Sequence, residues 1–256
     1  MIVTVYTSNT MRGSKSFLNG KRYQTSVFAK CCQLVFQEQR CSAIEVEGAK
    51  PGTDVTLSYG SVSHGIETKV SGAFEGGGVK VYFEGGRYTI HGECIHKYIL
   101  GDTSLYGNMA LPWYQGKRTE HDWEQVKDQF PDFYIDAPST AVSEYYKTAG
   151  SSYIQIENHG LYHTGEDPMQ LGVPFFDCPT RLRIRVSKHK KKGIPTDVTA
   201  ALVYTKPPKS PFSLDGTLPL PAPLRVVAES APLQVVADSA PLQVVAESAP
   251  LRAMAE

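Results

Sequence analysis

The chain has 256 residues, of which 41% are hydrophobic and 20% are charged, an ordinary composition for a globular protein. Its 26 Lys and Arg residues equal its 26 Asp and Glu residues in number, so a net charge of zero excludes general attraction to nucleic acid or membranes. No run of about eighteen apolar residues occurs, which argues against a membrane-spanning helix.

The N-terminal segment and the cysteines indicate a reducing compartment. The stretch "MIVTVYTSNT" has no basic residue before its apolar residues, so we predict a first strand and no signal peptide. The cysteines are sparse and odd in number, which does not suit the disulfide framework of a small secreted domain. We therefore expect a cytoplasmic protein.

The first clear helical pattern lies in "GKRYQTSVFAKCCQLVFQEQR". Apolar residues recur there at the spacing of one helix face, and Thr25 or Ser26 precedes them as a cap. The residues on this face are Val27, Phe28, Cys31, Leu34 and Val35. We expect Cys31 to serve as core packing, because free cysteine is often buried.

Two strand pairs follow along the chain. In "AIEVEGAKPGTDVTLSYG", alternation predicts two strands joined by a Pro-Gly turn. In "VKVYFEGGRYTIHG", Gly85 and Gly86 can form a two-residue turn. With that turn Phe83 faces Tyr88, and the same register places the apolar residues on one face and the polar ones on the other.

The remaining elements complete the predicted fold. "TEHDWEQVKDQF" and "PSTAVSEYYKTAG" have helical spacing, whereas "SSYIQIEN", "RLRIRV" and "TDVTAALVY" alternate as strands do. Strands and helices come in blocks and do not alternate as βαβ units. The sequence therefore predicts an α+β fold, a mostly antiparallel sheet or partial barrel with about three helices.

The composition changes after residue 206. Residues 207–221 hold five prolines, which predicts an extended linker. Residues 222–256 then repeat a nine-residue unit: "APLRVVAES", "APLQVVADS", "APLQVVAES" and "APLRAMAE". Two turns of helix per unit are conceivable but marginal alone, so we expect a flexible tail, or alternatively a docking tail for a protein partner. The globular domain is thus assigned to residues 1–206.

The segment "RLRIRVSKHKKKG" is the main functional candidate. On a strand, Arg181, Arg183 and Arg185 share one face, and their stems repeat every ~6.6 Å. Such a row repels itself unless acidic residues on neighbouring strands or a ligand with regular negative charge offsets it. Lysines extend the positive charge into the next turn: Lys188, Lys190, Lys191 and Lys192. The alternative is an edge strand that its charges protect from aggregation.

Aromatic side chains could provide stacking platforms for bases. Tyr82 lies on the polar side of the predicted hairpin, and Trp113 and Tyr114 lie beside basic residues in "LPWYQGKR". Each of these rings could instead belong to the core.

A second candidate site is the loop "IENHGLYHTGED". It holds acid and imidazole groups that could act in general-base chemistry or hold a divalent metal for phosphodiester cleavage: Glu157, His159, His163, Glu166 and Asp167. No established catalytic spacing is present. "HGECIH" at residues 91–96 does not predict a metal site, because on a strand its potential ligands would point to opposite faces.

These patterns favour a protein that binds single-stranded DNA or RNA through the basic strand and exposed aromatics, without a cofactor, and recruits partners through its tail. The alternative is a nuclease or another phosphodiester-acting enzyme that uses the loop from Glu157 to Asp167 with a divalent metal. A third hypothesis is a scaffold protein whose repeats do the binding. No stretch of the chain resembles a known family.

Overall fold

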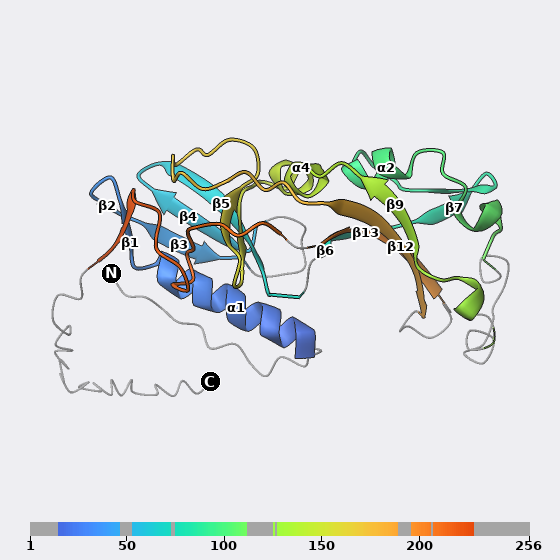
Figure 1. The fold of residues 1–256 in the computed structure, drawn as a ribbon, viewed down its shortest axis with the longest axis horizontal. Coiled ribbons are helices and arrows are strands. Elements are labelled where there is room, and N and C mark those ends of the chain that lie inside the picture. Colours follow the sequence, from blue (N-terminus) through green and yellow to red (C-terminus); the bar gives the residue numbers. More distant parts are fainter. Residues whose placement is uncertain are drawn as a thin grey trace, which may run out of the picture.

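The computed structural model describes residues 15–46, 53–72, 75–111, 125, 127–188, 196–205 and 207–227. Within them the chain forms an α+β fold whose strand pairs are antiparallel except for one (Figure 1). This confirms the predicted fold class. The described helices are α1 (Lys15–Cys31), α2 (Ile95–Leu100) and α4 (Ala141–Thr148), with 3-10 turns at Leu105–Asn108 and Lys127–Gln129. None of these helices is long and apolar enough to cross a bilayer.

A five-stranded sheet, in the order β11-β10-β5-β4-β3, forms one half of the fold. We call it the N-terminal half because it contains α1, although β10 and β11 join it from later in the chain. Its strands are β3 (Ser42–Glu45), β4 (Val55–Tyr59), β5 (Val62–Lys69), β10 (Ser151–Ile156) and β11 (Gly160–His163). Helix α1 packs along this sheet, and Val27 and Cys31 of the helix are fully buried beside Val55 and Leu57 of β4. This packing confirms the expected core role of Cys31.

A four-stranded antiparallel sheet forms the other half, in the order β6-β13-β12-β9. Its strands are β6 (Glu75–Lys80), β9 (Phe133–Ala137), β12 (Thr180–Lys188) and β13 (Thr196–Tyr204). Its inner face carries Leu182 and Ile184, which are fully buried in a second core that α2 and α4 cover (Figure 1). The basic strand β12 lies between β13 and β9 from Thr180 to Ile184, so the edge-strand alternative is wrong for that part, whereas residues 185–188 pair with β13 alone among the described strands.

The hairpin of β7 (Tyr82–Glu84) and β8 (Arg87–Thr89) has the register that the sequence predicts. Phe83 lies opposite Tyr88, and Glu84 opposite Arg87. Gly85 and Gly86 have φ angles of 57° and 78°, the left-handed values of a type I′ turn. Val81, Tyr88 and Ile90 are buried in the core, as expected for the apolar face.

The helix predicted around Val27 has different bounds. Helix α1 begins at Lys15 and ends at Cys31, so Thr25 and Ser26 lie within it and cap nothing. The chain then turns into β1 (Leu34–Phe36), which pairs with β2 (Gln39–Arg40). A helix prediction that includes Leu34 and Val35 is therefore wrong, because these apolar residues alternate between inner and outer faces of a short strand.

The two later helix predictions have different outcomes. Helix α4 covers most of "PSTAVSEYYKTAG" and is followed by Gly150 with φ 94°, as the pattern predicts. In "TEHDWEQVKDQF", Trp123 and Val126 lie outside the described residues, while Phe130 is buried in the core after a 3-10 turn.

The proline-rich segment packs against the N-terminal half, although the sequence indicates a linker. Leu214 and Leu224 are 2% and 4% exposed within the core of that half. Tyr23 of α1 donates a hydrogen bond of 2.7 Å to Asp215. Residues 224–226 of the first repeat form β14 (Leu224–Val226), which adds to β1 in the sheet β14-β1-β2. Prolines remove backbone donors but leave apolar side chains free to pack, which explains the difference.

Candidate nucleic-acid interface

The arginines of β12 lie on the outer face of the four-stranded sheet. Because side chains alternate along a strand, burial of Leu182, Ile184 and Val186 on the inner face turns Arg181, Arg183 and Arg185 outward. The predicted alternation of the strand is therefore present.

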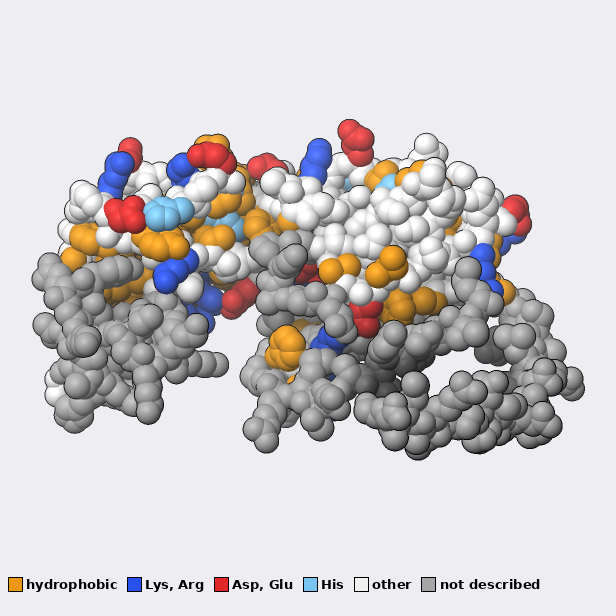
Figure 2. Space-filling view, turned by 180° about the vertical axis from the view of Figure 1, so that it is seen from behind, with side chains coloured by type: hydrophobic (Ala, Val, Ile, Leu, Met, Phe, Trp, Pro, Cys, Tyr) orange, Lys and Arg blue, Asp and Glu red, His pale blue; other side chains and the backbone are white. Residues whose placement is uncertain are grey.

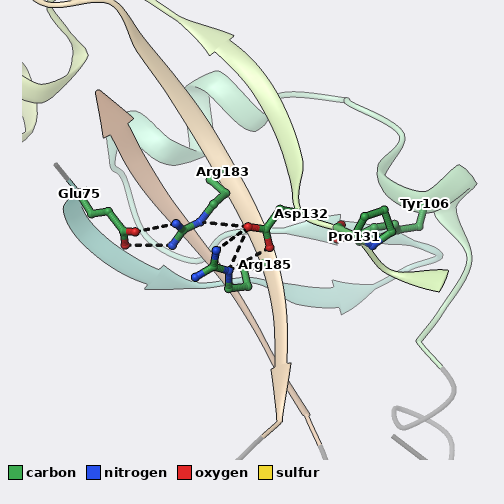
Figure 3. A network of polar contacts seen from close by, with 6 residues as sticks. All are labelled: Glu75, Tyr106, Pro131, Asp132, Arg183 and Arg185. Atoms are coloured by element: carbon green, nitrogen blue, oxygen red, sulfur yellow. Dashed lines mark hydrogen bonds and ion pairs between the residues drawn. The ribbon is translucent and has the colours of Figure 1, made fainter. Parts of the chain in front are cut away.

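Arg183 is held in an ion pair that reaches across the sheet. Its Nη1 and Nη2 atoms donate hydrogen bonds of 2.6 and 2.9 Å to the two carboxylate oxygens of Glu75 on β6 (Figure 3). β13 separates the two strands, and the residue of β13 opposite Arg183 is Ala201, whose small side chain lets the arginine pass over it. Only 11% of the Arg183 side chain is exposed, so the guanidinium is largely shielded from solvent.

Arg185 is paired with the residue that precedes β9. Its Nε and Nη2 atoms donate hydrogen bonds of 2.6 to 3.1 Å to both carboxylate oxygens of Asp132. These bonds lower the pKa of the Asp132 carboxyl below its ordinary value. Tyr106 donates a hydrogen bond of 3.1 Å to the carbonyl oxygen of Pro131, which helps to hold this segment in place (Figure 3).

Arg181 has a different environment from its two neighbours. Its guanidinium lies 4.7 Å from the centroid of the Tyr134 ring on β9, a cation–π contact. Asp136 is opposite Arg181 in the strand register, yet in the described part of the chain no carboxylate oxygen lies within 4.0 Å of the guanidinium. Arg181 is exposed, and Tyr134 is 43% exposed.

The guanidinium row is thus neutralised at two of its three positions. Glu75 and Asp132 come from segments 108 and 53 positions away, so the local sequence could not show them. Among the described residues on the face shown in Figure 2, Lys and Arg side chains are scattered among Asp and Glu and form no broad basic patch. The expectation of a row of arginines without acidic partners is therefore wrong at Arg183 and Arg185.

The other predicted nucleic-acid contacts are only partly described. The backbone of Lys188 ends β12, and Lys190, Lys191, Lys192, Trp113 and Tyr114 lie outside the described residues.

The ring of Tyr82 stacks on that of His91, with centroids 3.9 Å apart and planes 6° from parallel. His91 in turn contacts the Glu84 carboxylate at 3.0 Å. Tyr82 therefore already has a stacking partner in the loop that follows the hairpin.

The acid and imidazole groups of the second candidate loop have structural contacts. Glu157 accepts a hydrogen bond of 2.9 Å from the backbone nitrogen of Ser71, and His159 Nδ1 lies 3.0 Å from the Glu157 carbonyl oxygen. Asp167 accepts hydrogen bonds from the Tyr153 hydroxyl at 2.6 Å and the Gly172 nitrogen at 2.8 Å.

The remaining loop candidates give no evidence of a metal site. His163 ends β11 with its ring against Phe175, and Glu166 lies in the loop that follows. Among the described residues, no three His, Cys, Asp or Glu side chains are grouped to hold a metal ion. In "HGECIH", His96 is fully buried in α2, and residues 91–94 form a loop, not the strand considered from the sequence.

Comparison of the chain with protein-family models, curated proteins and solved structures finds no match.

Proposed function

We propose that the protein binds single-stranded DNA or RNA on the outer face of the sheet β6-β13-β12-β9. The observation that carries this proposal is the Arg181–Tyr134 pair, an exposed guanidinium 4.7 Å from the centroid of an exposed ring on the edge strand β9 of this sheet. A planar guanidinium that a ring holds in place offers a surface on which a base can stack. Stacking of this kind tolerates any base.

The paired arginines have a separate role in this proposal. Arg183 and Arg185 donate to Glu75 and Asp132, so a phosphate would have to compete with a carboxylate for each of them. The residues that contact phosphates in this proposal are therefore Arg181 and the lysines between residues 188 and 192. We therefore expect fewer ionic contacts than the seven basic residues of the segment suggest, and a larger share of the affinity from stacking.

A salt titration of oligonucleotide binding tests the proposal. For single strands, log Kd changes with log salt by ~0.7 per phosphate contact, so Arg181→Gln should reduce the slope by about 0.7 and Arg183→Gln should leave it nearly unchanged. Arg87→Gln is the matched control, since Arg87 is an exposed arginine that pairs with Asp102 on the hairpin side. Absence of binding at low salt, or equal slopes for all three variants, would refute the proposed surface.

Stacking is tested by Tyr134→Ala in the same assay. Loss of one aromatic platform costs about 1–3 kcal/mol, so affinity should fall by about 5- to 140-fold. Tyr98→Ala is the control, because Tyr98 is 68% exposed on α2, which packs on the opposite side of the sheet. Binding should persist in EDTA, whereas oligonucleotide shortening that His159→Ala abolishes would favour the nuclease hypothesis instead.

A test of partner recruitment by the tail must spare the first repeat. Residues 224–226 belong to a sheet, so a deletion from residue 222 would disturb the fold. A deletion of residues 228–256 keeps β14, so a loss of partner binding in this variant would not be caused by disturbance of that sheet.

A further inference from the structure

The first repeat unit, residues 222–230, supplies a strand to the N-terminal half of the fold. β14 runs antiparallel to β1, with Leu224 opposite Phe36 and Arg225 opposite Val35. The Val227 nitrogen donates a further hydrogen bond of 2.8 Å to the Gln33 carbonyl oxygen. The unit therefore covers one edge of β1, while β2 covers the other.

Among the described residues of this unit, 222–227, one side chain is buried and anchors it. Leu224 is 4% exposed and lies in the same core as Leu34 and Phe36 of β1. Arg225 is exposed and makes only a surface ion pair of 3.4 Å with Glu38, and Val226 is 53% exposed. Recognition of the unit thus depends on backbone pairing and on the leucine.

The later units preserve what the first unit buries. The anchoring leucine recurs as Leu233, Leu242 and Leu251, each preceded by Ala-Pro. The exposed position of Arg225 varies, being Gln in the second and third units and Arg in the fourth. The second exposed position, Val226, is Val in the second and third units and Ala in the fourth, so of these three positions only the leucine is identical in all four units. Identity at the buried position is what a shared binding site on β1 would require.

We propose that the edge of β1 is a binding site for the repeat unit and that the second unit of the same chain, residues 231–239, exchanges with the first. The second unit offers the same backbone and the same leucine, and it lacks only the exposed ion pair with Glu38, which contributes little. When the second unit replaces the first, the nine residues of the first unit become part of a loop. The entropic cost of closing a loop grows only slowly with its length. A unit tethered this closely has an effective concentration near millimolar, which favours the same chain over a second copy.

The exchange has a structural consequence. An uncovered strand edge is a site for aggregation, so β1 needs a partner strand. Four units for one edge allow the first unit to leave while another keeps the edge covered.

Cysteine trapping in the full chain tests the exchange directly. Val35→Cys with Arg225→Cys is the positive control, because these residues lie opposite each other. Val35→Cys with Gln234→Cys should form a disulfide within one chain, several-fold more than Val35→Cys with Ser239→Cys, a tail position outside the anchoring segment. Peptide mapping separates these links from links to the native cysteines.

Two results would overturn the exchange. One is trapping at residue 234 no greater than at residue 239. The other is trapping found only between a labelled and an unlabelled copy, which would assign the exchanging strand to a second chain.

Leucine variants provide a second measurement that does not depend on disulfide chemistry. Leu224→Asp alone should retain most of the hydrogen-exchange protection of the Val35 amide, which lies on the β14 side of β1, because the second unit takes its place. Asp at all four leucines should abolish that protection, whereas Asp at Leu233, Leu242 and Leu251 alone should leave it unchanged. Equal loss in the single and the fourfold variant would contradict the proposal.

Discussion

At the scale of single residues, the acidic partners of the arginines determine what the outer sheet face can do. Glu75 holds Arg183 by two hydrogen bonds while the guanidinium is largely shielded from solvent. A charge in such a position is costly without its partner, because its hydration has already been lost. The carboxylates therefore stabilise the sheet and at the same time reduce its positive charge.

Replacing Glu75 should separate these two effects. Glu75→Gln leaves Arg183 without its bidentate partner, so we expect the free energy of unfolding to fall by about 1–2 kcal/mol in urea titrations. If the outer face binds nucleic acid, the same variant should bind oligonucleotides more tightly, with a steeper salt dependence. Glu144→Gln removes the same charge in the first turn of α4, where the carboxylate accepts a hydrogen bond from Thr140, so it is the control for affinity, which it should not change. Unchanged affinity in Glu75→Gln would argue against this face as the interface.

At the scale of elements, turn chemistry and side-chain alternation act together in the hairpin β7–β8. Gly85 and Gly86 both have positive φ, and no heavy atom lies within 4 Å of the place where a Cβ of either would stand. A side chain at either position would therefore strain the backbone but would not clash with neighbouring atoms. The turn can therefore be probed without disturbing the core.

The two glycines should respond differently to substitution. Gly85→Asn should be nearly neutral, because Asn-Gly is the preferred pair of a type I′ turn. Gly86→Val should destabilise the fold by about 1–2 kcal/mol, since a branched residue tolerates left-handed backbone poorly. Thermal or urea unfolding measures both, and equal stability of the two variants would show that the turn is not of this type.

At the scale of the whole molecule, a buried ion pair lies where the two cores meet. Glu67 and Lys69 of β5 are 2.7 Å apart, and the Lys69 ammonium lies 5.3 Å from the centroid of the Tyr146 ring on α4. Burial raises the pKa of the Glu67 carboxyl to about 7, because desolvation outweighs the attraction of Lys69. The folded state therefore binds a proton on Glu67 more tightly than the unfolded chain does.

The sign of the pH dependence follows from this raised pKa. The contribution of Glu67 to stability should be greatest below its ordinary pKa of 4.5 and should fall as the pH rises towards 7, by no more than about 3 kcal/mol. Above pH 7 the contribution is constant. Urea titrations at pH 5 and pH 7.5 should show this decline in the parent chain and a smaller one in Glu67→Gln. An identical decline in both would mean that Glu67 titrates normally.

The sequence by itself determined the features that depend on neighbours along the chain. Alternation predicted strands β10, β12 and β13, the turn glycines predicted the hairpin register, and the blocks of elements predicted the α+β class. Helix α1 was misplaced because a short apolar strand directly follows it, and over a few residues the periods of helix and strand overlap.

Only the tertiary structure decided the charge of the candidate interface and the place of the C-terminal segment. Glu75 and Asp132 reach the arginines through strand order and register, which depend on contacts between distant segments. The first repeat became a strand because the edge of β1 and the core beside it were there to receive Leu224. Local propensity describes what a segment can form, whereas the partner that it meets in the folded chain selects among those forms.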